Sequence, residues 1–302
     1  MAEDEMMSSS GFRSSRYFRG IAALFTVMKA GVFGRLGGLG VNTYGGTTTT
    51  FKEQYEALED EFIEQVRKDN EGLEEDALNR SVFLPNLAPQ GPVDFVLVAM
   101  EPSTGGGAGE IQQGDAFSPK NFTGSVEDFI LHFCAREYLC AGGKSYYLTD
   151  LSKGAMRTRE ARDQRQERYQ EWYPLLKDEL RLVARPEAPV IAIGNDPHAF
   201  LIRRDIEPRL KGPILHYSQQ AAGARERIPS THRDRYSNFA MEVSWGDIEE
   251  TVRQVMGASE LQDYIEGTLD RLSRGQKLTE SRKKLMFTYK VQFEGIRKEV
   301  GI

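Results

Sequence analysis

The chain has 302 residues, of which 39% are hydrophobic, and carries a formal net charge of −6. This length allows one large domain or two modest ones with a substantial core. The acidic balance argues against a protein that coats polyanions with its whole surface, but it is compatible with a local basic patch. Two cysteines, Cys134 and Cys140, are too few for a disulfide framework or a cysteine-rich metal site. We expect a cytoplasmic protein with two buried thiols.

Residues 1–50 are expected to form a poorly ordered or accessory arm. The stretch 16–38 resembles a signal peptide, but Lys29 interrupts its apolar centre and acidic residues lie near the start. The arm ends in GVNTYGGTTTT, which is typical of a loop. No apolar run approaches the roughly 20 residues that a membrane span requires, so we expect no membrane partner.

The next part of the chain alternates between strand and helix patterns. Residues 51–69 have apolar side chains at helical spacing. Short apolar runs follow at 93–99, 145–149, 189–194 and 213–217, and helical patterns follow the first three at 125–140, 157–184 and 196–204. Continuous hydrophobicity indicates strands that are covered on both faces. The sequence therefore predicts an α/β fold with three layers, α/β/α, and a central four-stranded parallel sheet.

The character of the sequence changes from Trp245 onward. The segments DIEETVRQVM, ELQDYIEGTLDRL and ESRKKLMFTYKVQFEGIRKEV are charged, favour helix and contain no proline. We therefore expect an α/β domain over 51–256 and a C-terminal helical extension over 257–302 that packs on the core.

Four polar residues lie at or near the ends of the predicted strands: Glu101, Asp150, Asp196 and His216. Ligands of open parallel sheets bind outside the carboxyl ends of the strands, so we expect these side chains to converge. For Asp196 the favoured interpretation is a helix cap, because Pro197 follows it at a helix start.

Glu101 is followed by PSTGGGAGE, which is too rich in glycine to begin a helix at once. Such glycines let backbone amides approach a ligand closely. The stretch matches neither the P-loop nor the dinucleotide fingerprint, and no metal site is evident, so we expect no cofactor and no metal.

A basic segment extends from Leu201 to Arg235. It contains eight lysines or arginines against four acidic residues. This local excess is what a phosphate-binding surface requires, although a solvated charged face would have the same composition.

Taken in order, these stretches resemble the uracil-DNA glycosylase superfamily. The motifs that carry the resemblance are AMEPS, YYLTDLSK, the helix and strand that lead to IGNDPHAFL, and HYS, over roughly residues 83–256. The family cleaves the N-glycosidic bond of a base flipped out of DNA. The resemblance therefore implies a monofunctional DNA glycosylase that leaves an abasic site, with DNA as its partner and no obligate protein partner.

The resemblance also assigns roles by position. Glu101 would orient water and stabilise positive charge on the sugar, and His216 would stabilise the departing base. Ser103, Lys153 and Ser218 would contact DNA phosphates, as would Arg225 and Arg227 in the basic segment, while Phe117 or Phe122 would stack on the flipped base. An anion near the sugar and a donor near the base both favour the charge separation of N-glycosidic cleavage.

The sequence departs from the family at several positions. Glu101 is longer than the usual residue, and Tyr217 replaces a proline. Gln219 stands where an apolar side chain of the family often enters the duplex as a wedge. The most consequential departure is Asp150, which replaces the asparagine that reads uracil. An ionised carboxylate only accepts hydrogen bonds, so it matches the amino group of cytosine and repels the carbonyl of uracil.

A modified cytosine is therefore the expected target. In this respect the chain resembles the phage-defence glycosylases that remove glucosylated hydroxymethylcytosine from viral genomes. Three alternatives stay open: a uracil-DNA glycosylase of base-excision repair, a non-catalytic DNA- or nucleotide-binding module, and an enzyme that acts on free nucleotides.

Overall fold

A computed structural model describes residues 49–71, 81–103, 120–206, 209–217, 226–257, 262–274 and 278–302. Apart from its last two residues, the predicted arm lies outside these ranges, as do Phe117, Ser218 and Arg225. The first half of the fold contains α1 (Phe51–Asp69), β1 (Val82–Phe83), β2 (Phe95–Ala99), α2 (Val126–Cys134), η1 (Ala135–Leu139), β3 (Tyr146–Asp150), β4 (Gly154–Ala155) and α3 (Thr158–Val183). The second half contains β5 (Val190–Ile193), α4 (Asn195–Leu201), β6 (Leu210–Ile214), η4 (Ser230–His232), α6 (Arg233–Glu242), α7 (Trp245–Met256), α8 (Gln262–Ser273) and α9 (Glu280–Glu299).

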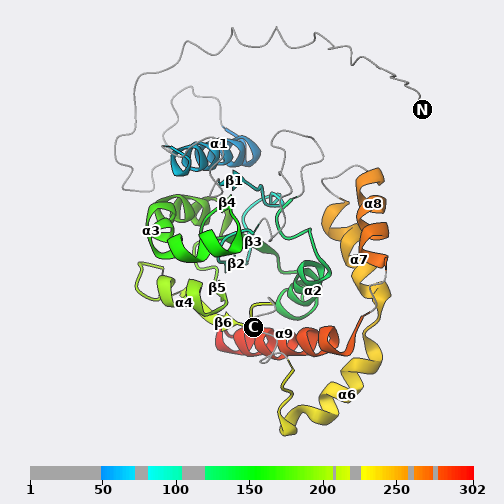
Figure 1. The fold of residues 1–302 in the computed structure, drawn as a ribbon. Helices are drawn as coiled ribbons and strands as arrows, with labels where there is room; N and C mark the ends of the chain where they lie inside the picture. Colours follow the sequence, from blue (N-terminus) through cyan, green and yellow to red (C-terminus); the bar gives the residue numbers. More distant parts are fainter. Residues whose placement is uncertain are drawn as a thin grey trace, which may run out of the picture. The chain divides into compact units, whose positions relative to one another are not determined.

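The centre of the fold is a four-stranded parallel sheet in the order β3-β2-β5-β6 (Figure 1). The sheet confirms the predicted α/β class. Every residue of β2 and β5 is buried, which explains why these strands are continuously apolar in the sequence. Ala99 at the end of β2 pairs with Asp150 at the end of β3, so the two carboxyl ends are aligned.

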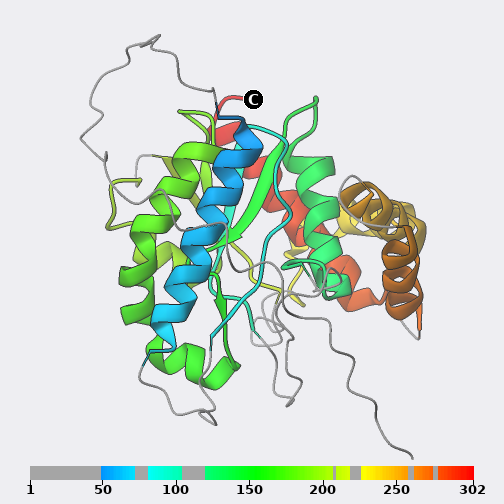
Figure 2. The ribbon, with the colours of Figure 1, turned by 90° about the horizontal axis from the view of Figure 1, so that it is seen from above.

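Helices cover both faces of the sheet, with α1 and α3 on one side and α2 and α9 on the other (Figure 2). Alternate residues of β2 belong to different hydrophobic clusters: Val96 and Val98 lie with α3, whereas Leu97 and Ala99 lie with α2 and α9. The crossover from β2 to β3 uses α2, and the crossover from β3 to β5 uses α3. From β2 the chain adds β3 on one side and then crosses over to add β5 on the other side. This reversal of strand order creates a topological switch point at the carboxyl ends of β2 and β5.

Several helix starts are encoded locally. Thr50, Ser125 and Ser244 are N-cap residues of capping boxes, with the acidic partner three residues later in each case. The capping pair fixes the first turn because it satisfies amides that have no partner within the helix. The predicted helix over 51–69 agrees with the observed bounds of α1, and the capping box at Thr50 accounts for its start.

The C-terminal helix α9 is part of the main core. Leu285, Tyr289, Phe293 and Ile296 are buried in the cluster that α2 and the sheet also form. The segment predicted as a helical extension thus supplies much of one layer. Along the described ranges, no helix is both long enough and apolar enough to cross a membrane.

Several elements differ from the sequence prediction. Strand β6 ends at Ile214, so His216 lies in the loop that follows the strand and not within it. The helix expected over 125–140 changes to a π-helical turn at Ala135, and Cys134 and Cys140 are free and buried at its two ends. The short strands β1 and β4 and helix α6 were not predicted, because two-residue strands have no periodicity and α6 buries only Phe239.

Candidate functional site

A cavity of about 480 Å³ lies at the carboxyl ends of the strands. Its walls include the four strand-end residues Glu101, Asp150, Asp196 and His216. The parallel topology brings them together although they are spread over the sequence. The cavity thus combines these three carboxyl groups with an imidazole, and Asp128 adds a fourth carboxyl group to its wall.

Glu101 is held by two donors from α3. The Arg165 guanidinium donates to Oε1 through Nη2 at 2.6 Å and through Nε at 3.2 Å, and the Tyr169 hydroxyl donates to Oε2 at 2.8 Å. The Glu101 side chain is 6% exposed and that of Arg165 15% exposed. Charge-assisted hydrogen bonds of this kind fix the orientation of the carboxylate.

The second arm of the Arg165 guanidinium reaches Asp196. Nη1 of Arg165 donates to Oδ2 of Asp196 at 2.5 Å, and the Asp196 side chain is 50% exposed. The interpretation of Asp196 as the helix cap is wrong in detail. The N-cap of α4 is Gly194, which makes no side-chain cap bond, and Asp196 lies within the first turn. Its carboxylate is engaged by Arg165 because α3 passes beside this helix start.

Asp150 is buried at the end of β3, with 2% of its surface exposed. The Asn121 side-chain amide donates a hydrogen bond to its Oδ2. Burial raises the pKa of Asp150 to about 8, and the negative charges of Glu101 and Glu179 act in the same direction, whereas Lys153 and the Asn121 bond oppose the shift. Near neutral pH this carboxyl group is therefore mostly protonated.

Lys153 does not face the cavity. It is 1% exposed, and its Nζ donates to Oε2 of Glu179 at 2.7 Å and to the Asp150 carbonyl oxygen at 2.5 Å. The expectation that Lys153 contacts a DNA phosphate is therefore corrected, because the ammonium is enclosed in the core and already bound to a carboxylate. Its position instead ties the end of β3 to α3.

His216 is half-buried beside the end of β5, and its ring stacks on that of Tyr217 with centroids 4.9 Å apart. Burial lowers the pKa of His216 to about 4, and the positive charge of Arg165 lowers it further. The imidazole is therefore neutral at physiological pH. Gly194 permits this arrangement: its φ is +93°, and a Cβ there would meet the Cβ of His216 at 3.4 Å.

Phe122 lies in the cavity wall in an unusual backbone conformation. Its φ is +59°, in the left-handed region that non-glycine residues seldom adopt. The Phe122 amide donates to Oδ1 of Asn121 at 3.0 Å, and its carbonyl oxygen accepts from Nε2 of His132 at 3.2 Å. Strain of this kind persists only where the surroundings hold it, and it is common at functional sites.

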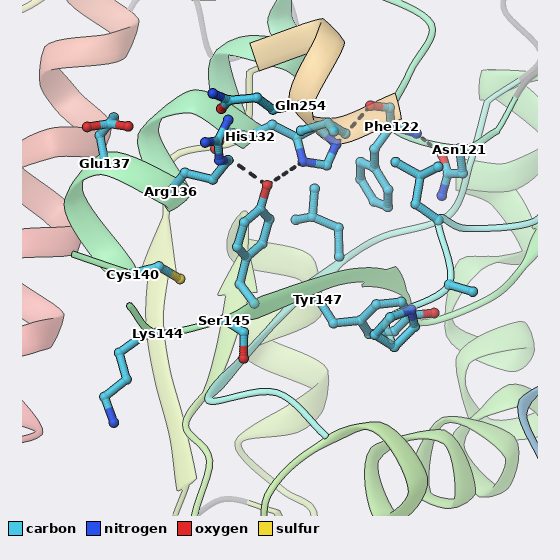
Figure 3. A pocket seen from close by; sticks show the side chains of 16 residues that line it. Asn121, Phe122, His132, Arg136, Glu137, Cys140, Lys144, Ser145, Tyr147 and Gln254 are labelled. Atoms are coloured by element: carbon cyan, nitrogen blue, oxygen red, sulfur yellow. Dashed lines mark hydrogen bonds between the residues drawn. The ribbon is translucent and has the colours of Figure 1, made fainter. Parts of the chain in front are cut away.

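A second cavity, of about 450 Å³, shares Asn121 and Phe122 with the first. Figure 3 shows His132 between the Phe122 backbone and a tyrosine hydroxyl. This hydroxyl belongs to Tyr146 and lies 2.7 Å from Nδ1 of His132. Since Nε2 donates to a carbonyl oxygen, Nδ1 accepts from the tyrosine. Burial lowers the pKa of His132 to about 4, so this neutral histidine acts as a fixed support for Phe122.

The remaining predicted DNA contacts are only partly described. Ser103 is exposed, and its hydroxyl is 2.8 Å from that of Thr158 at the start of α3. Arg227 is also exposed. Phe117, Ser218 and Arg225 lie outside the described residues, so their predicted roles stay predictions.

The contribution of α3 to the site was not predicted from the sequence. Arg162 and Arg165 line the cavity, and Lys120 adds a third cation. A signal was present, because arginines occur at 157, 159, 162, 165 and 168, and the last three share one side of a helix. Arg168 is nevertheless buried and binds Ser81 and Ser152, so the pattern alone does not separate site from core.

Over the part of the chain that the structure describes, no group of three or more His, Cys, Asp or Glu is placed to hold a metal ion. No protein-family model, curated protein or solved structure matches the chain. The fold and the cavity therefore define a parallel three-layer α/β protein whose site, at the switch point of the sheet, is built from carboxyl groups, a neutral imidazole and arginine.

Proposed function

We propose that this protein is a DNA glycosylase that hydrolyses the N-glycosidic bond of a flipped-out pyrimidine, with a modified cytosine as its main target. The observation that carries the proposal is the convergence of Glu101, Asp150, His216 and Phe122 on one cavity at the carboxyl edge of the sheet. These side chains supply a sugar-facing anion, a base reader, a base-facing donor and an aromatic wall.

Glu101 acts on the sugar. Cleavage builds positive charge on the sugar ring, and a fixed carboxylate nearby lowers the energy of that state. Both oxygens of Glu101 already accept hydrogen bonds from Arg165 and Tyr169. We therefore assign Glu101 an electrostatic role and not that of a proton acceptor.

His216 acts on the departing base. Because its pKa is about 4, the neutral ring offers an N–H donor to the negative charge that develops on the base. His216→Ala is expected to slow base release in a single turnover while DNA affinity stays unchanged.

Asp150 decides which base is accepted. Above its pKa of about 8 the carboxylate only accepts, so it suits the amino group of a cytosine. Below that value the carboxyl group both donates and accepts, so it can also pair with uracil. This observation favours a second candidate function, that of a uracil-DNA glycosylase, because Asp150 is mostly protonated near pH 7.

The test uses oligonucleotides that contain uracil, cytosine, hydroxymethylcytosine or glucosylated hydroxymethylcytosine, with abasic sites detected by alkaline cleavage. Assays at about pH 6.5 and 9 separate the candidates, because uracil release should fall as Asp150 ionises. Release of a modified cytosine at both pH values supports the main proposal. Binding of DNA without release of any base would instead indicate a non-catalytic module, and cleavage of free nucleotides alone would indicate a nucleotide enzyme.

A further inference from the structure

Arg165 occupies an unusual place for a cation in this cavity. Its guanidinium lies between two carboxylates from different elements, Glu101 after β2 and Asp196 on α4. Both contacts are short, at 2.6 and 2.5 Å. One positive charge therefore links the two sides of the cavity, and it lies next to Glu101, the residue assigned to the sugar.

The two contacts of Arg165 differ in their surroundings. Glu101 is 6% exposed and is also held by Tyr169, so this half of the guanidinium is fixed. Asp196 is 50% exposed, and an ion pair that water reaches is weak and readily exchanged. The Nη1 arm is thus directed at the solvent-facing side of the cavity and is held there by a replaceable anion.

The natural replacement is a phosphodiester oxygen. A guanidinium matches phosphate and carboxylate oxygens equally well in charge and geometry. Arg162 and Lys120 line the same cavity, so a phosphate would meet further positive charge there, whereas Asp196 repels it. Asp196 thus occupies, in the free protein, the position that an incoming phosphate would take.

We propose that Arg165 binds a DNA backbone phosphate next to the flipped nucleotide, and that Asp196 is a placeholder that this phosphate displaces. The inference rests on the proposed function, since it requires DNA in the cavity. It adds a phosphate-binding residue on α3 that also holds Glu101 in position. One guanidinium then couples the arrival of the backbone to the group that stabilises the sugar.

The test measures DNA binding, because loss of Arg165 would impair catalysis through Glu101 under either interpretation. Fluorescently labelled single-stranded and duplex oligonucleotides without modified bases are titrated by anisotropy between about 50 and 200 mM salt. Arg165→Gln should weaken binding and lower the salt slope by about 1, as the loss of one phosphate contact predicts. Arg165→Lys keeps the positive charge but lacks the planar guanidinium with its several donors. The DNA affinity of this variant should therefore lie between those of the wild type and Arg165→Gln.

Asp196→Asn gives the sharper result. Removal of the placeholder should tighten DNA binding several-fold in the wild type but not in the Arg165→Gln background. Asp178→Asn is the matched control, because Asp178 is an exposed aspartate on α3 that pairs with Arg181, and neither residue lines the cavity. Melting temperatures confirm that each variant is folded. If Arg165→Gln does not fold, the comparison of Asp196→Asn with Asp178→Asn decides between the two interpretations.

Two kinds of failure are distinguishable. If the wild type binds DNA but Asp196→Asn tightens binding no more than Asp178→Asn, or tightens it equally without Arg165, the placeholder inference is wrong. Arg165 then serves only to position Glu101. If the wild type binds no DNA even at the lowest salt, the proposed function itself fails, and the inference fails with it.

Discussion

At the scale of single residues, the site depends on side chains whose charge is set by burial. Asp150 and His216 both have pKa values shifted toward the neutral form, to about 8 and about 4. Arg165 and Tyr169 provide Glu101 with the hydrogen bonds that a buried carboxylate requires. The cavity therefore combines two groups shifted toward the neutral form with the carboxylates of Glu101 and Asp196, which Arg165 links.

Glu101→Gln tests the anion. The amide keeps the size of the side chain but removes the charge opposite the developing positive sugar. Base release should fall about 100-fold or more in single-turnover assays, with DNA affinity little changed. Glu167→Gln, at an exposed position on α3, should retain full activity. Near-normal turnover of Glu101→Gln would remove Glu101 from the mechanism.

Asp150→Asn tests the buried acid through stability. The folded-state pKa of about 8 exceeds the ordinary value of 3.8, so the folded chain retains a proton that the unfolded chain releases between these values. Stability contributed by Asp150 is therefore full below about pH 4 and falls as pH rises toward 8, by at most about 1.4 kcal/mol per pH unit.

The Asn variant has no such titrating group. The free energy of unfolding of the variant minus that of the wild type should therefore increase from pH 5 to pH 8. Urea denaturation at several pH values measures this difference. Asp163→Asn, at an exposed aspartate, should show no such trend relative to the wild type. A constant difference between Asp150→Asn and the wild type would mean that Asp150 is ionised in the folded protein.

At the scale of elements, a buried ion pair joins the sheet to α3. Lys153 follows β3 and Glu179 lies on α3, with side chains 2% and 0% exposed. Glu179 also accepts from the hydroxyls of Tyr147 and Thr149 at 2.8 and 2.9 Å. This pair holds the end of β3 against the helix that carries Arg165, so it supports the site without facing the cavity.

Lys153→Met should lower the free energy of unfolding by about 3–5 kcal/mol, because Glu179 would keep a buried charge without its partner. Adding Glu179→Gln should recover part of the loss. Lys144→Met, at a 43% exposed lysine, should change stability by no more than about 1 kcal/mol. Folded Lys153→Met should bind DNA with an unaltered salt slope, and a reduced slope would restore Lys153 as a phosphate contact.

At the scale of the whole molecule, the last helix completes the core. Phe293 of α9 is fully buried, and its ring stacks on that of Tyr289 with centroids 5.9 Å apart. The face of the sheet that carries Leu97 and Ile191 belongs to the same cluster. The α/β layers therefore depend on a helix that begins at Glu280, far along the chain from strand β2 (Phe95–Ala99).

Phe293→Ala should lower the free energy of unfolding by about 3–5 kcal/mol, because it leaves a cavity in the layer between α9 and the sheet. Ile302→Ala, at a 49% exposed residue that follows α9, should change the free energy of unfolding by less than about 0.5 kcal/mol. Chemical denaturation compares the two variants. Equal, small losses would mean that α9 is a detachable extension and not part of the core.

The amino-acid sequence by itself determined the α/β class, the four central strands and the carboxyl-end position of Glu101 and Asp150. These features follow from local patterns: continuous apolar runs, helical spacing and capping residues all act over a few neighbours. The bounds of α1 and α3 were predictable for the same reason, since each carries a long periodic pattern.

Only the tertiary structure decided the electrostatics of the site. Whether an arginine of α3 faces the cavity, as Arg165 does, or the core, as Arg168 does, depends on how the helix is rotated against the sheet. Burial of Lys153 and the protonation of Asp150 likewise depend on groups from distant segments, such as Glu179 and Asn121. Charge and desolvation act through space and not along the chain, so no local pattern encodes them.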